Sequence, residues 1–130
     1  MNKRRTFSLT IAHYKILETV YLLNEQSIYP TSLGVEKILS GIEDKETSPY
    51  SNFSSYGTLI SFSNKKVSRY IMMLTRYKYL TKRLNVDDQN LYIAITNLGV
   101  TSLVKFKEKH PNIFKKKEGK QNPNFVKIEE

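Results

Sequence analysis

The sequence predicts a mainly helical α+β domain that carries one two-stranded β-hairpin near its C-terminal end. Apolar residues recur at helical spacing in four stretches, and after Leu80 the period becomes that of strands. The chain has 130 residues, of which 39% are hydrophobic, enough for one core. We therefore expect one domain over residues 10–110, with a basic flexible arm at 1–9 and a basic, mostly flexible tail at 111–130.

Two helices are expected before residue 42. The first runs from Thr10, a good N-cap residue, to Glu25. Pro30 interrupts the pattern, and a short second helix begins at Thr31 or Ser32 and ends at Gly41, because glycine is favoured just after a helix. The apolar positions expected to face the core are Ile11, Tyr14, Ile16, Leu17, Val20, Tyr21 and Leu23 in the first helix, and Leu33, Val35, Ile38 and Leu39 in the second.

The third expected helix, over residues 63–80, is the most informative stretch of the chain. Residues 42–56 before it read as a loop, and residues 58–62 are expected to add one helical turn. A helical wheel puts Val67, Tyr70, Ile71, Leu74 and Tyr77 on one face, and Lys65, Arg69, Met72 and Arg76 on the other, with Lys66 and Met73 beside them. Seven Lys/Arg and no Asp/Glu lie between residues 63 and 83, in a chain whose net charge is +9. This concentration of positive charge favours a polyanionic partner, and Ser63 is expected to cap a helix start that attracts phosphate.

A β-hairpin and a last helix follow. Thr81–Asn85 and Leu91–Ile95 are strand-like and flank a turn at residues 86–90. A hairpin alone is unstable, so one face, either Leu91, Ile93 and Ile95 or their alternates, must pack against the helices. The last helix begins after Thr96, with Leu98, Leu103, Val104 and Phe106 as its apolar positions, and ends before Pro111. The order predicts a winged helix-turn-helix: a three-helix core, a hairpin wing and a C-terminal helix.

Several function classes are excluded. The chain has no cysteine, and His13 and His110 lie too far apart in sequence to build a metal site, so we expect no metal and no cofactor. His13 is interpreted as a surface or partly packed residue. The clustered carboxylates, Glu43, Asp44, Glu46, Asp87 and Asp88, lie in a loop and a turn and are interpreted as solvated rather than catalytic. With no long apolar run and no secretion signal, the sequence indicates a cytoplasmic, non-enzymatic protein without a membrane segment.

Residues 16–109, about 70% of the chain, resemble the RQC winged-helix domain of RecQ-family DNA helicases. Four short motifs carry the resemblance: Ile38-Leu-Ser-Gly41, Ser55-Tyr-Gly57, Leu74-Thr-Arg-Tyr-Lys-Tyr-Leu80, and Leu91-Tyr-Ile-Ala-Ile-Thr96 followed by Gly99 and Leu103. The resemblance implies a module of DNA replication or repair that acts with a separate helicase or repair protein. It also implies phosphate contacts from the starts of the second and third core helices and from the wing, whose tip pries apart terminal base pairs.

This chain departs from the family pattern at two places in the sequence. Ser40 stands where members usually carry Arg, and the wing tip is Asp87-Asp88-Gln89 where unwinding members carry an aromatic or apolar wedge. Carboxylates repel phosphates and offer no ring for stacking, so we expect duplex binding without strand separation. The chain also lacks the G-x-x-x-x-G-K-[ST] loop of an ATPase, so we expect a stand-alone module.

The sequence therefore predicts a monomeric, non-enzymatic domain that binds double-stranded DNA through its phosphates. The expected contact residues are Ser63, Lys65, Lys66, Arg69, Arg76, Lys82 and Arg83. One alternative is a dimeric winged-helix transcriptional regulator, which would read an operator with the same helix and dimerise through its terminal helices. Another alternative, from a different class, is a protein-interaction module whose basic face meets an acidic partner.

Overall fold

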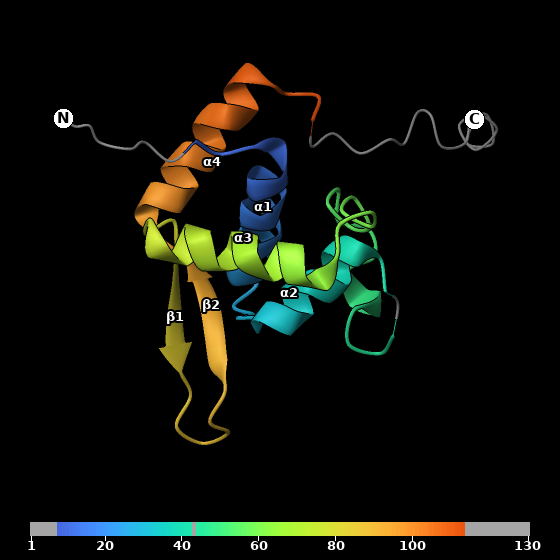
Figure 1. Ribbon diagram of the computed structural model, residues 1–130, viewed down its shortest axis with the longest axis vertical. Coiled ribbons are helices and arrows are strands. Elements are labelled where there is room, and N and C mark those ends of the chain that lie inside the picture. The colour runs from blue at the N-terminus through green and yellow to red at the C-terminus, as the bar shows by residue number, and fades with distance from the viewer. Residues whose placement is uncertain (1–7, 43, 114–130) are drawn as a thin grey trace.

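The computed structural model describes residues 8–42 and 44–113, which form a mainly helical α+β fold. The elements in chain order are α1 (Ile11–Glu25), α2 (Ser32–Ser40), a 3-10 turn η1 (Ser48–Tyr50), α3 (Asn64–Arg76), β1 (Leu80–Leu84), β2 (Leu91–Ile95) and α4 (Asn97–Lys109). The helices α2, α3 and α4 surround α1, and the antiparallel hairpin β1–β2 extends away from them (Figure 1). Most of the predicted arm and tail lies outside the described residues.

The predicted N-caps are confirmed. Thr10, Thr31, Ser63 and Thr96 each precede a helix in extended backbone. The last three accept a hydrogen bond of 3.1 Å from the backbone N–H three residues later. Such bonds satisfy N–H groups that have no partner within the helix. These short polar residues therefore place the start of each helix.

Three predicted boundaries are corrected by the structure. The basic helix ends at Arg76 rather than Leu80, because Lys78 adopts a left-handed backbone (φ 71°). Leu80 then begins β1, so this strand starts and ends one residue earlier than predicted. Residues 58–62 form turns and no helix. The chain leaves the helix early because Thr96 binds the carbonyl oxygens of both Lys78 and Tyr79, which ties this corner to the start of α4.

The core lies between α1 and the elements around it. It consists of Ala12, Ile16, Leu17, Val20, Val35, Leu39, Leu59, Val67, Ile71, Leu74, Leu80, Ile93 and Leu103. Four helical residues predicted to face the core are exposed instead, so those predictions were wrong: Ile11, Leu33, Leu98 and Val104. On the hairpin, the core-facing side is the one with Ile93 and Ile95, whereas Leu91, nearer the tip, is exposed. Conversely, Glu18 and Thr19 are buried, because α1 contacts α2, α3, α4 and β2 and is therefore covered on most sides.

The hairpin is fixed to the helices at its base only. Its register pairs Leu80 with Ile95 and Lys82 with Ile93, so Leu80 and Ile93 face the core together. The edge of β2 that does not pair with β1 contacts the segment between α1 and α2. There the N–H of Ile93 donates a hydrogen bond to the carbonyl oxygen of Pro30 (2.8 Å). Beyond this base, residues 82–91 are exposed and form the projecting end of the hairpin in Figure 1.

Candidate nucleic-acid interface

The helix α3 has one buried and one exposed face, as the sequence predicts. Val67, Ile71 and Leu74 are buried on the core side. The opposite side is exposed and carries Lys65, Lys66, Arg69, Met72 and Arg76. Met72 keeps 52% of its surface exposed, so even the apolar member of this set faces outwards. We call the cations Lys65, Lys66, Arg69 and Arg76 the basic face of α3.

Among the described residues, no carboxylate forms an ion pair with the cations of this face. In the described parts of the chain the ion pairs lie elsewhere: Lys37 pairs with Asp44 and Glu46, and Lys107 pairs with Glu18. Lys66 lies over the ring of Phe62, with its Nζ 4.5 Å from the ring centre, a contact that keeps the charge and orients the side chain. A row of cations without carboxylate partners attracts anions from solution.

The start of α3 adds to the positive electrostatic potential of the basic face. Ser63 caps the helix, with its Oγ accepting from the N–H of Lys66, and the first turn contains no acidic residue. The remaining N–H groups of the first turn carry the positive end of the helix dipole. The dipole and the cations Lys65 and Lys66 therefore act in the same direction at this end of the helix.

The predicted contact residues of the hairpin do not share one surface. Lys82 and Arg83 are neighbours in β1, so their side chains lie on opposite faces of the two-stranded sheet. Lys82 lies on the face of Leu80 and Ile93, which pack against the same core as α3. Arg83 lies on the face of its cross-strand partner Tyr92. The structure thus places Lys82 on the side of α3 and turns Arg83 away from it.

Hydrogen bonds fix the backbone of the hairpin tip and the carboxylate of Asp88. Asn85 Oδ1 accepts from the N–H groups of Asp87 (2.9 Å) and Asp88 (3.3 Å). Asp88 accepts from the N–H of Asn90 and from the hydroxyl of Tyr92. The Tyr92 hydroxyl lowers the pKa of Asp88, so this side chain stays a carboxylate at neutral pH. The tip therefore presents negative charge and no aromatic wedge.

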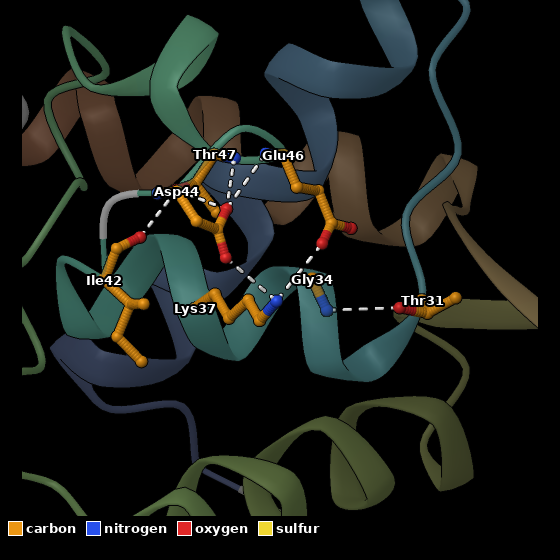
Figure 2. A network of polar contacts seen from close by, with 7 residues as sticks. All are labelled: Thr31, Gly34, Lys37, Ile42, Asp44, Glu46 and Thr47. Atoms are coloured by element: carbon orange, nitrogen blue, oxygen red, sulfur yellow. Dashed lines mark hydrogen bonds and ion pairs between the residues drawn. The ribbon is translucent and has the colours of Figure 1, made fainter.

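The start of α2 differs from that of α3. Lys37 extends between two carboxylates of the following loop, with its Nζ 3.1 Å from Asp44 and 3.3 Å from Glu46 (Figure 2). The hydrogen bond from Lys37 lowers the pKa of Asp44, which remains ionised. Glu46 also lies beside Gly34 in the first turn of α2. The resemblance implies phosphate contacts from the starts of both α2 and α3. Acidic side chains border the start of α2, however, and would repel a phosphate there. Glu43, named with these carboxylates, lies outside the described residues.

His13 has a structural position, more buried than the sequence predicts. Its Nδ1 accepts a hydrogen bond from the backbone N–H of Thr10 (2.9 Å), and its ring stacks on Tyr70 with centres 4.4 Å apart. Burial lowers the pKa of this imidazole. The contact joins the start of α1 to the inner side of α3 and so helps to hold the helix that carries the basic face.

Two tyrosines that the sequence pattern did not single out line a cleft beside the hairpin, on the Arg83 face. They are Tyr29, in the turn after α1, and Tyr92, in β2. Both tyrosines line the same cleft because of the strand register and the path of the chain near Pro30. The sequence signal for this cleft is the two-residue period of the strands. It puts Tyr92 and Ala94 on one face of the predicted hairpin, the face that also carries Arg83.

No family model matches this chain, and no curated protein matches it either. In the described part of the chain, no helix has both the length and the apolar character needed to cross a membrane. The assignment of a function therefore depends on the residues and on their geometry.

Proposed function

We propose that this protein is a winged-helix domain of the RQC type that binds double-stranded DNA without catalysing a reaction. The observation that carries the proposal is the basic face of α3, whose four cations are exposed on one side of a helix and have no carboxylate partner among the described residues. In this proposal α3 is the helix that docks on DNA, the hairpin is the wing, and Lys82 extends the basic face from the wing.

Phosphates are the groups that this surface fits best. The residues of the basic face are lysines and arginines, with neither Asn nor Gln between positions 65 and 76 to pair with base edges. Contacts of this kind fix a protein on the duplex but carry little sequence information. We therefore propose that the protein binds many duplex sequences with moderate affinity, and that this affinity depends on the salt concentration. In this proposal the protein acts as a monomer beside a separate helicase or repair protein.

The dimeric transcriptional regulator is the second candidate, because Ile11 on α1 and Leu98 and Val104 on α4 are exposed apolar residues on the helices that such a dimer would use. Sedimentation equilibrium separates the two candidates. The RQC-type proposal expects a monomer with and without DNA, whereas a stable two-fold dimer that binds one palindrome much more tightly than other duplexes favours the regulator.

The test of duplex binding compares two variants with equal loss of charge. Arg69→Ala/Arg76→Ala removes two cations from the basic face, and Lys105→Ala/Lys109→Ala removes two exposed cations from α4. Fluorescence anisotropy with a short blunt duplex should show a loss of at least about tenfold for the first variant, since each charged hydrogen bond is worth on the order of 1 kcal/mol or more. The second variant should bind nearly as tightly as the unmodified protein.

Equal losses in the two variants would mean that net charge alone matters and would contradict an interface on α3. Tighter binding to an acidic polypeptide than to duplex, abolished by the same α3 substitutions, would favour the protein-interaction module.

A further inference from the structure

A cleft of about 600 Å³ lies between the hairpin and the C-terminal end of α1, on the face of the hairpin that carries Arg83. It is lined by Asn24, Tyr29, Arg83, Leu84, Asn85, Tyr92, Ala94 and Ile95. Its volume falls in the range of about 300–1,000 Å³ that is usual for sites of small organic ligands. The duplex interface proposed above uses none of these residues.

The walls of the cleft are fixed by hydrogen bonds. Asn24 accepts from the N–H of Ile95 (2.8 Å) and donates to the carbonyl oxygen of Ile28 (3.0 Å), so it ties β2 to the turn that carries Tyr29. Tyr92 is held from the other side by its hydroxyl, which donates to Asp88. These bonds fix Tyr92 and the backbone near Tyr29, whose side chain keeps 51% of its surface exposed.

Arg83 is the charged residue that lines the cleft, and the Asp88 carboxylate adjoins the cleft through the hydroxyl of Tyr92. Arg83 is the direct cross-strand partner of Tyr92, and no acidic residue lines this cleft. A second cleft, of about 400 Å³, shares Tyr29 and Tyr92 and is also lined by Glu46. Along this side of the molecule an anion is thus attracted at the Arg83 end, and a neutral planar group is accommodated beside the tyrosines.

We propose that this cleft binds an unpaired nucleotide, with the base against Tyr29 and Tyr92 and the phosphate at Arg83. Stacking on tyrosine accepts any base, and an arginine holds a phosphate through two parallel hydrogen bonds. A paired base cannot enter, because its faces are covered by its neighbours in the duplex. The ligand is therefore a single-stranded overhang that continues from the duplex bound at α3, and to this extent the inference rests on the proposed function.

The experiment compares a blunt duplex with the same duplex carrying a short unpaired overhang, by fluorescence anisotropy. The overhang should strengthen binding about tenfold, as expected for one or two stacked bases. Tyr29→Ala should remove this gain and leave the affinity for the blunt duplex unchanged, and Tyr29→Phe should restore the gain because it keeps the ring. Tyr50→Ala is the matched control, since Tyr50 lines only the second cleft.

Failure of the inference differs from failure of the proposed function. If blunt duplex binds but the overhang adds nothing, or if its gain persists in Tyr29→Ala, the cleft does not hold a nucleotide. If blunt duplex does not bind, titration with a deoxynucleoside monophosphate still tests the cleft: shifts of the amide NMR signals of Tyr92 and Ala94 support it, and their absence overturns it. Shifts caused by an acidic peptide alone would assign the cleft to a protein partner and would also overturn the proposal.

Discussion

At the scale of single residues, His13 takes the place that Glu or Gln usually occupies three residues after an N-cap. Its Nδ1 must be unprotonated to accept the bond from Thr10 N–H, and burial against Tyr70 also disfavours the charged ring. A pattern of apolar residues does not reveal this role, because it depends on packing between α1 and α3. The neutral imidazole therefore links the stability of the fold to pH.

The free energy of unfolding should fall as the pH is lowered through the ordinary histidine pKa of 6.5. The folded-state pKa of His13 is lowered, so the unfolded chain binds the proton first, and the stabilisation present above 6.5 is lost towards the folded-state value. Urea unfolding between neutral and mildly acidic pH measures this slope. His13→Gln should flatten it, because this substitution removes the imidazole whose pKa is lowered in the folded state. A slope that survives in His13→Gln would contradict this account.

Gly99 is required by close packing at the start of α4. A Cβ at this position would overlap the carbonyl oxygen of Tyr79 and would lie 2.7 Å from Cγ1 of Ile95. Gly99→Ala should therefore lower the free energy of unfolding by about 1–3 kcal/mol. Gly34→Ala is the control, because its Cβ would meet Thr31 at an ordinary 3.5 Å, and it should be neutral or stabilising by up to about 1 kcal/mol. Equal stability of the two variants, measured by thermal unfolding, would refute the packing argument.

At the scale of the elements, the sequence predicts most of what is observed. Caps and apolar periods locate the helices, and the change of period at Leu80 locates the hairpin, because these are local properties of the chain. The exposed basic face of α3 is predicted for the same reason. The opposite orientations of Lys82 and Arg83, the acidic border of α2 and the cleft at Tyr29 depend on contacts between distant segments, which residue patterns do not encode.

The orientation of the hairpin leads to a prediction about its two cations. Lys82 is proposed to lie beside the duplex, whereas Arg83 faces the cleft. Lys82→Ala should weaken binding of a blunt duplex by several fold, by about the loss of one charged contact. Arg83→Ala should weaken it much less. If the two substitutions have the same effect in anisotropy titrations, the hairpin does not dock by one face.

The chemistry of the hairpin tip predicts that a bound duplex stays paired to its end. Asp87 and Asp88 bring the wrong charge towards phosphates, and the tip offers no ring to replace lost base stacking. Fluorescence of 2-aminopurine at a duplex end should stay constant when saturating protein is added. The variant Asp87→Lys/Asp88→Phe should raise it. A clear rise with the unmodified protein would show that the tip separates strands as it stands.

At the scale of the whole molecule, the arrangement separates the charges by location. Asp44 and Glu46, in the loop after α2, pair with Lys37, and Glu18 of α1 pairs with Lys107, so none of the ion pairs among the described residues involves the basic face of α3. The helices hold this face on a rigid core, because the other side of α3 is buried by Val67, Ile71 and Leu74. The central claim is therefore that α3 and Lys82 neutralise DNA phosphates.

The salt dependence of duplex binding tests this claim most directly. With five phosphates neutralised by the basic face and Lys82, log K should fall with log salt at a slope of about −4 to −5. In Arg69→Ala/Arg76→Ala the slope should shrink to about −3, because two of these contacts are lost. Anisotropy titrations of one duplex over a salt series provide both values. A flat salt response, or an unchanged slope in the double variant, would contradict the claim that α3 is the DNA-binding surface.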